Sequence, residues 1–111
     1  MGLSIGIDFG YTNTRAAIVL GTGKPDVIPN QERYRHTPSV VVRDHRDGTI
    51  LVGKHAMNRA WADPVNAIFS IRRLMGRRYT DPEVERVRQH VSYRIVRPPD
   101  GRDQAYVQLG D

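Results

Sequence analysis

The chain has 111 residues, with 39% hydrophobic and 26% charged residues, which suits about one small folded domain and argues against disorder. It contains no cysteine, which excludes disulfides and thiolate metal sites. No segment approaches the roughly 18 consecutive apolar residues of a membrane span, so we expect no membrane insertion.

The charge balance is basic, with a net charge of +5 and fifteen arginines among the seventeen basic residues. Arginine favours bidentate contacts with phosphate, so a nucleic-acid-binding surface is one interpretation. The basic residues are spread along the chain with few aromatic residues between them, so we favour an arginine-rich composition, or a fragment whose acidic remainder is missing. The N-terminus lacks a basic segment followed by an apolar core and a cleavage site, so we expect no secretory signal and a cytoplasmic location.

The N-terminal segment predicts two buried strands, at residues 4–8 and 16–20, around a polar turn. The first strand ends in Asp8, which can face a hydrated metal ion. Gly10 permits close approach of the backbone to an anion, and the N–H groups of residues 11–14 can point together at phosphate oxygens. Such hairpins also occur without a ligand, so the residues alone leave a phosphate site and an unliganded hairpin as alternatives.

The middle of the chain predicts three short strands, at residues 26–29, 40–42 and 50–52. The Thr37-Pro38 pair forces an extended backbone ahead of the second of these strands. Asp47-Gly48 favours a tight turn, which predicts a hairpin between the second and third strands.

Three short helices are predicted next, at residues 54–62, at residues 67–75 and from Asp81-Pro82 onward. Gly76 is expected to cap the second helix, and Asp81 to cap the start of the third. The residues expected to face inward are Ala56, Ala60, Met57, Trp61, Phe69, Val84 and Val87. Strands at residues 92–96 and 106–109 complete the pattern, around a turn at residues 98–101.

These elements predict an α+β fold in two parts, with β strands and the polar turn in residues 1–38 and a mixed α+β lobe in residues 39–111. Four arginines of the second part form either a phosphate-binding patch or a surface paired with acids such as Glu83 and Glu85; they are Arg72, Arg73, Arg77 and Arg78. The histidines lack metal-ligand spacing and are expected at the surface or in loops; they are His36, His45, His55 and His90.

An ordered series of short motifs runs from the start of the chain to about residue 110. It consists of Ile5-Gly6-Ile7-Asp8-Phe9-Gly10 with Thr12-Asn13, Lys24-Pro25 with Val27-Ile28-Pro29-Asn30, Arg35, Thr37-Pro38-Ser39-Val40-Val41, Asp47-Gly48, Leu51-Val52-Gly53, Ala56, Asn66, Ile68-Phe69-Ser70-Ile71, Arg73-Leu74-Met75-Gly76-Arg77-Arg78-Tyr79 and residues 93–96. This series resembles the start of the ATPase domain of the heat-shock-70 (DnaK-type) chaperones.

The resemblance implies a partial actin-like ATPase (ribonuclease H-like) fold, with the hairpin region of subdomain IA and nearly all of subdomain IB. It also implies ATP or ADP with magnesium as the cofactor. Asp8 would then bind magnesium through water, and the phosphates would be contacted by Gly10, Tyr11, Thr12, Asn13 and Thr14. The family's catalytic lysine corresponds to Arg72.

Two positions depart from the family pattern. Tyr11 stands where the family usually has a small threonine, and a phenol needs more space than a phosphate cradle offers. Arg72 keeps the positive charge of the lysine, but its planar guanidinium is larger and is not the same point charge. In a complete domain carrying Arg72, we expect phosphate binding to survive and hydrolysis to slow by orders of magnitude.

The resemblance implies ATP-driven protein folding in the stress response, with a J-domain co-chaperone, a nucleotide exchange factor and unfolded client proteins as partners. By the same resemblance the rest of the ATP site lies beyond residue 111, so we expect weak or absent ATP binding and no turnover from this chain alone. Two alternatives remain. One is a non-catalytic binding or scaffold module that dimerises through exposed strand edges, and the other is an arginine-rich nucleic-acid binder.

Overall fold

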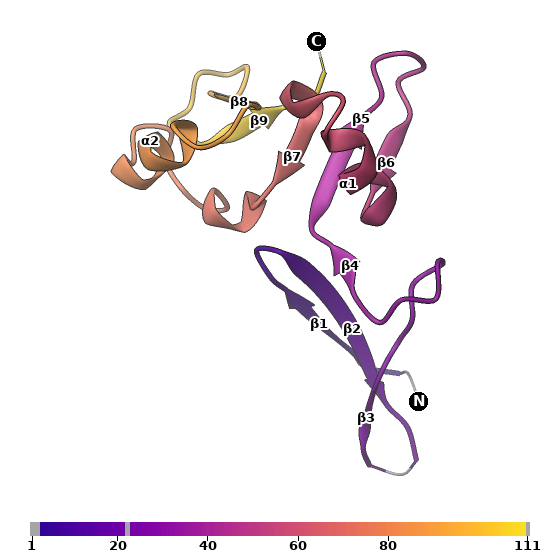
Figure 1. Ribbon diagram of the computed structural model, residues 1–111. Helices are drawn as coiled ribbons and strands as arrows, with labels where there is room; N and C mark the ends of the chain where they lie inside the picture. Colours follow the sequence, from indigo (N-terminus) through magenta and orange to yellow (C-terminus); the bar gives the residue numbers. More distant parts are fainter. Residues whose placement is uncertain (1–2, 22, 111) are drawn as a thin grey trace.

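The computed structural model describes residues 3–21 and 23–110, whose strands form three antiparallel sheets (Figure 1). The first sheet is centred on β2 (Asn13–Val19), which pairs with β1 (Ile5–Phe9), β3 (Pro25–Val27) and β4 (Thr37–Pro38). The second places β5 (Val40–Arg43) between β6 (Ile50–Val52) and β7 (Ala67–Phe69). The third pairs β8 (Arg94–Val96) with β9 (Tyr106–Gln108).

The helices are short, and both α-helices lie where the sequence predicts them. α1 (Lys54–Ala60) packs on β5, and α2 (Pro82–Arg88) follows the predicted cap. Asp81 accepts a hydrogen bond from the Glu83 N–H at 2.9 Å, with proline at the first helical position. Within the described ranges, no helix has the length and apolar character needed to cross a membrane.

The predicted helix at residues 67–75 is wrong. Its first part is the strand β7, in which Ile68 lies opposite Val41, and its second part is a 3₁₀ turn, Ile71–Arg73. A short buried apolar run does not distinguish strand from helix, and here β5 offers an edge with which the run can pair. Gly76 does adopt the left-handed conformation expected of a cap, with φ of 74°.

The buried core lies in the second part of the chain, in two clusters. One contains Ile68, Leu74, Val84, Val87, Tyr93 and Ile95, and the other contains Val42, Ala56 and Ala67. Both cores fall within the predicted second part, although the boundary between residues 38 and 39 stays a prediction.

Three expectations about inward-facing side chains are corrected by the structure. Trp61 is 91% exposed, because α1 ends at Ala60 and the indole lies in solvent beyond the end of the helix. Met57 is also exposed, on the outer face of α1. Phe69 is 38% exposed, and its ring meets Tyr93 edge-on with 5.5 Å between the ring centroids.

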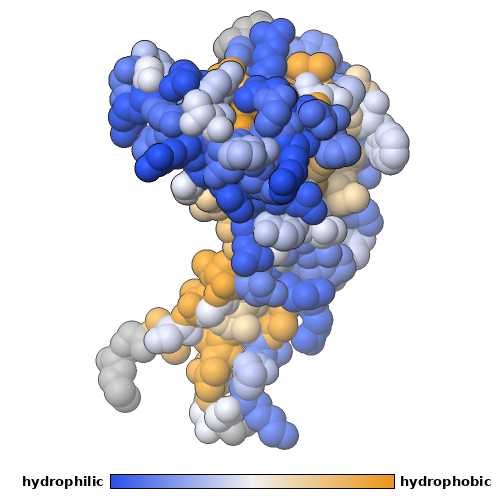
Figure 2. All heavy atoms as spheres, turned by 90° about the vertical axis from the view of Figure 1, so that its left-hand side faces the viewer, coloured by the Kyte–Doolittle hydropathy of each residue, from blue (hydrophilic) through white to orange (hydrophobic). Residues whose placement is uncertain are grey.

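The first sheet projects from the lobe and is not buried as predicted. Ile5 and Ile7 are 58% and 70% exposed, and every residue of β1 is exposed. The radius of gyration is 16.4 Å, against about 13 Å for a compact domain of this length. On the face that Figure 2 shows, hydrophobic surface accordingly gathers on the projecting hairpin, while the lobe is mostly hydrophilic.

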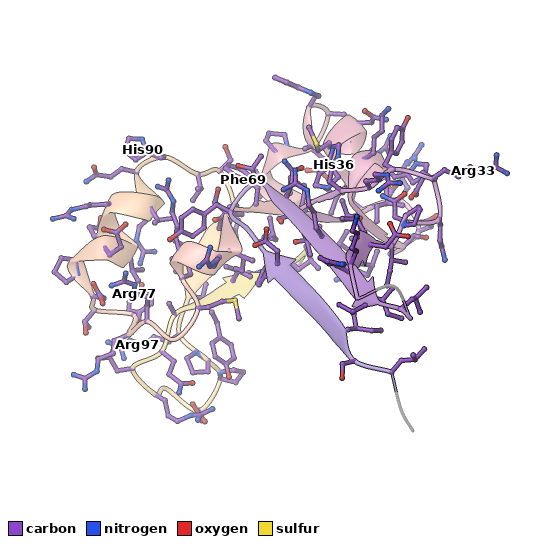
Figure 3. The ribbon with its side chains drawn as sticks, turned by 90° about the horizontal axis from the view of Figure 1, so that it is seen from below. Arg33, His36, Phe69, Arg77, His90 and Arg97 are labelled. Atoms are coloured by element: carbon purple, nitrogen blue, oxygen red, sulfur yellow. The ribbon has the colours of Figure 1, made fainter. Side chains whose placement is uncertain are left out.

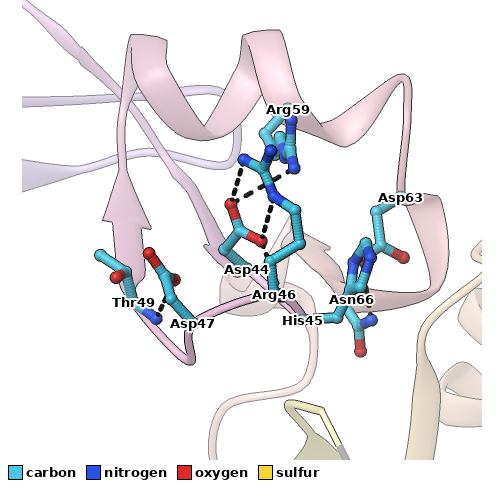
Figure 4. Close-up of polar contacts among 8 residues, drawn as sticks. All are labelled: Asp44, His45, Arg46, Asp47, Thr49, Arg59, Asp63 and Asn66. Atoms are coloured by element: carbon cyan, nitrogen blue, oxygen red, sulfur yellow. Dashed lines mark hydrogen bonds and ion pairs between the residues drawn. The ribbon is translucent and has the colours of Figure 1, made fainter.

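A paired polar network fixes the turn between β5 and β6 (Figure 4). The buried carboxylate of Asp44 accepts hydrogen bonds from Arg46 Nε and Nη2 at 3.1 and 2.9 Å. Arg59 reaches the same carboxylate from α1 at 3.3 Å. The Arg46 hydrogen bonds hold the pKa of Asp44 well below its usual range. Both guanidinium groups therefore act on the one buried carboxylate, and we interpret the network as structural.

Candidate functional site

The turn between β1 and β2 is closed by a hydrogen bond from the Gly10 N–H to the Asn13 carbonyl oxygen, at 3.0 Å. A Cβ atom at position 10 would lie 2.6 Å from that same oxygen. Gly10 is therefore required by the close approach of two backbone segments within the turn. This is a different reason from the approach of an anion that the sequence suggests.

Ser39 binds the turn to the rest of the molecule. Its N–H donates to the Thr12 carbonyl at 2.8 Å, and its hydroxyl donates to the Gly10 carbonyl at 2.9 Å. The Thr14 hydroxyl lies 2.8 Å from the Ser39 oxygen and must donate to it, because the single Ser39 proton is already used. Sequence reasoning did not single out Ser39 as a site residue, although the extended Thr37-Pro38 pair that places it was recognised.

These contacts engage the carbonyl groups of the turn and leave two of its N–H groups without a partner among the described residues. The carbonyls of Gly10, Thr12 and Asn13 all accept hydrogen bonds from within the molecule. The N–H groups of Tyr11 and Thr12 donate to no other described residue, and both residues are exposed. Successive outward N–H groups with engaged carbonyls make an anion-binding concavity.

Tyr11 and Arg72, the two residues that depart from the family pattern, contact each other beside this turn. The guanidinium carbon of Arg72 lies 5.0 Å from the centre of the Tyr11 ring, and that of Arg73 lies 5.3 Å from it. Both arginines are exposed, on the 3₁₀ turn that follows Ser70, whose φ of 53° is left-handed. Among the described residues neither arginine forms an ion pair. The structure thus brings Arg72 to the predicted phosphate turn.

The other arginines of the predicted patch take different roles. Arg77 pairs with Asp81 at 3.3 Å. Glu83 and Glu85 pair with later arginines of α2, at 3.1 Å in both cases. Arg78 is exposed and, like Arg72 and Arg73, forms no ion pair with the described residues. Of the four arginines of the predicted patch, Arg77 alone is therefore paired with an acid among the described residues.

Asp8 lies apart from these contacts. It is exposed on β1 with Arg15 as its register partner on β2, and its carboxylate makes no hydrogen bond or ion pair with the described residues. The part of the chain that the structure describes has no cluster of three or more histidine, aspartate or glutamate residues. His36 and His90 lie on opposite sides of the molecule (Figure 3). A single carboxylate with waters is a mode in which magnesium binds, so the donor set at the hairpin fits that ion bound together with phosphate.

Comparison with known families decides the relationship of the chain. The family model described as Hsp70 protein matches residues 4–111. The chain belongs to the Hsp70 family. The α+β structure of this Hsp70-family chain, with its antiparallel sheets and two α-helices, is consistent with a partial actin-like ATPase fold. The match also makes the chain an Hsp70-like chaperone family member.

Proposed function

We propose that this Hsp70-family chain uses the turn at residues 10–14, together with Arg72, to bind the phosphates of ATP or ADP. One observation carries the proposal. The N–H groups of Tyr11 and Thr12 have no partner among the described residues, and two guanidinium groups without an ion pair lie beside the same turn. Backbone donors and arginine are both suited to phosphate oxygens.

Asp8 is proposed to hold magnesium through water at the end of β1. Bound magnesium would neutralise phosphate charge. The carboxylate of Asp8 is exposed and unpaired among the described residues, so it is free to accept hydrogen bonds from metal-bound water. Arg72 corresponds to the family's catalytic lysine, and we propose that it orients the outermost phosphate.

The strength of binding follows from the number of contacts. Each hydrogen bond from the turn contributes about 0.5–1.5 kcal/mol net, and association costs several kcal/mol or more. We therefore propose weak binding by the described residues, with a Kd of about 1 mM, which corresponds to about −4.1 kcal/mol. ATP-driven folding with a J-domain co-chaperone, an exchange factor and client proteins is proposed only for a protein that carries the whole nucleotide cleft.

A titration followed by amide NMR tests this proposal. Adding ADP with magnesium should shift the N–H resonances of Tyr11 and Thr12, and adenosine alone should not. An Arg72→Ala variant should weaken the response, whereas Arg94→Ala, which removes an exposed positive charge from β8, should leave it unchanged. Shifts confined to other regions, or equal effects of the two variants, would contradict a phosphate site at this turn.

A second candidate function, self-association, is supported by the exposed edge of the first sheet. Among the described residues, β1 pairs only with β2, and its residues Ile5 and Ile7 are strongly exposed. An unpaired strand edge with apolar side chains favours strand addition from another chain. A homodimer through β1 is therefore the form of the scaffold hypothesis that the geometry favours.

A further inference from the structure

We propose that Tyr11 is a positioning residue that holds Arg72 and Arg73 together as an anion clamp beside the turn. Both guanidinium carbons lie near one aromatic ring, at 5.0 and 5.3 Å from its centre. The inference rests on the proposed phosphate-binding function and assigns a role to the residue that departs most from the family pattern.

The contact with the Tyr11 ring leaves the N–H donors of both arginines able to bind an anion. A guanidinium group near an aromatic ring is attracted by the electrons of that ring, while its planar fork of five N–H donors remains available for oxygen atoms. Tyr11 is 46% exposed, so a ligand can approach these donors from solvent. One ring therefore restricts two long side chains that would otherwise be free to sample many rotamers.

A second cluster in the same molecule shows what is different about this one. Tyr79 also lies under two arginines, with Arg88 and Arg97 at 5.0 and 4.8 Å from its ring centre. There each guanidinium is neutralised by an acid, because Arg88 pairs with Glu85 at 3.1 Å and Arg97 pairs with an aspartate at 3.8 Å. The positive charges at Tyr79 are therefore balanced by acids and leave no need for an anionic ligand there.

The Tyr11 cluster lacks such acids. Among the described residues, Arg72 and Arg73 have no ion-pair partner, although they are adjacent and repel each other. Two adjacent guanidinium groups without an acidic partner among the described residues, beside N–H groups that also lack a partner, suit an anion with a charge of about two, such as a terminal phosphate. The ligand class is therefore the terminal phosphate of a polyphosphate, carried either by a nucleotide or by inorganic tripolyphosphate.

The test uses the full chain with Tyr11→Phe and Tyr11→Leu, and with Tyr106→Leu as a control at a tyrosine of similar exposure, 42%. The first readout needs no ligand. An aromatic ring shifts the NMR signals of nearby side-chain protons, so the Arg72 and Arg73 signals should move in Tyr11→Leu and stay near the wild-type positions in Tyr11→Phe. The control should leave these signals unchanged.

The second readout is binding of tripolyphosphate and, separately, of ATP. Tyr11→Leu should weaken both by about fivefold, the size expected for loss of exposed cation–π contacts, and Tyr11→Phe should restore wild-type binding. An effect on tripolyphosphate alone or on ATP alone would overturn recognition of a shared terminal phosphate.

The remaining outcomes separate this inference from the proposed function. Unchanged arginine signals in Tyr11→Leu would overturn the clamp. Altered signals with undiminished binding of both ligands would overturn the positioning role and leave phosphate binding at the turn intact. Failure of the wild-type chain to bind either ligand would overturn both proposals.

Discussion

Gly10 shows how a single missing side chain shapes the candidate site. We predict that Gly10→Ala lowers the free energy of unfolding by about 1–3 kcal/mol, because its Cβ would lie 2.6 Å from the Asn13 backbone oxygen. Gly6→Ala is the matched control, since no heavy atom of the described residues beyond its two chain neighbours lies within 4 Å of its Cβ position, and it should be neutral or stabilising. Chemical denaturation, with amide exchange in β2, measures both. Equal effects of the two variants would refute the steric requirement.

At the residue scale, the site residues stay a prediction, and the structure adds contacts that the sequence did not indicate. The resemblance placed Arg72 with the turn, and the structure brings its guanidinium to the Tyr11 ring. The contact itself could not be predicted, because it joins side chains about sixty residues apart through a turn that was expected to be a helix. Trp61 was predicted to be buried from its residue type, but the end of α1 leaves it exposed.

At the scale of elements, the segment around Leu74 ties the 3₁₀ turn that carries Arg72 to α2. Leu74 is 2% exposed and belongs to the same core cluster as Val84 and Val87. We predict that Leu74→Ala lowers the free energy of unfolding by about 2–5 kcal/mol. The neighbouring Met75 is 60% exposed, so Met75→Ala should change stability by only about 0.5 kcal/mol. Thermal and urea unfolding of the pair provide the comparison, and a small effect at Leu74 would contradict the core assignment.

The elements predicted correctly are those with local signals. The Asp47-Gly48 turn gave the β5–β6 hairpin, and Asp81-Pro82 gave the start of α2. The segment at residues 67–75 was assigned wrongly because its state depends on pairing with β5, which is distant in sequence. Local patterns do not contain that information.

At the scale of the whole molecule, hydrogen-bonded carboxylates set the response to acid. Asp44, Asp63, Asp81 and Asp103 each have a pKa held below the ordinary 3.8 chiefly by hydrogen bonds to the carboxylate. Because the folded pKa values are lower than the unfolded ones, this stabilisation is fully present above about pH 5 and is lost as pH falls below about 4.

We therefore predict that the melting temperature changes little between pH 7 and 5 through these groups and falls steeply below pH 4. Asp44→Asn should lower the melting temperature at pH 7 and make the fall below pH 4 shallower, because one of the contributing groups has been removed. Circular dichroism melts over this range measure the effect. An unchanged slope in Asp44→Asn would show that its pairing with Arg46 and Arg59 does not differ in energy between the two protonation states.

The exposed first sheet predicts concentration-dependent self-association. Ile7→Ser, which removes an apolar side chain that is 70% exposed on β1, should weaken any dimer by about tenfold, because burial of an isoleucine contributes about 1.5–3 kcal/mol. Val65→Ser, at a site 46% exposed in the lobe, is the control and should have no effect. Sedimentation velocity over a range of concentrations measures this difference. A monomer at all concentrations would remove the scaffold hypothesis.

Ser39 is the single residue between β4 and β5, and its backbone and hydroxyl also hold the tip of the hairpin. Ser39 therefore joins the hairpin tip to the lobe, in addition to the contact of the Tyr11 ring with Arg72 and Arg73. A movement of the Gly10 or Thr12 carbonyls would act through these hydrogen bonds on the residue that leads directly into β5.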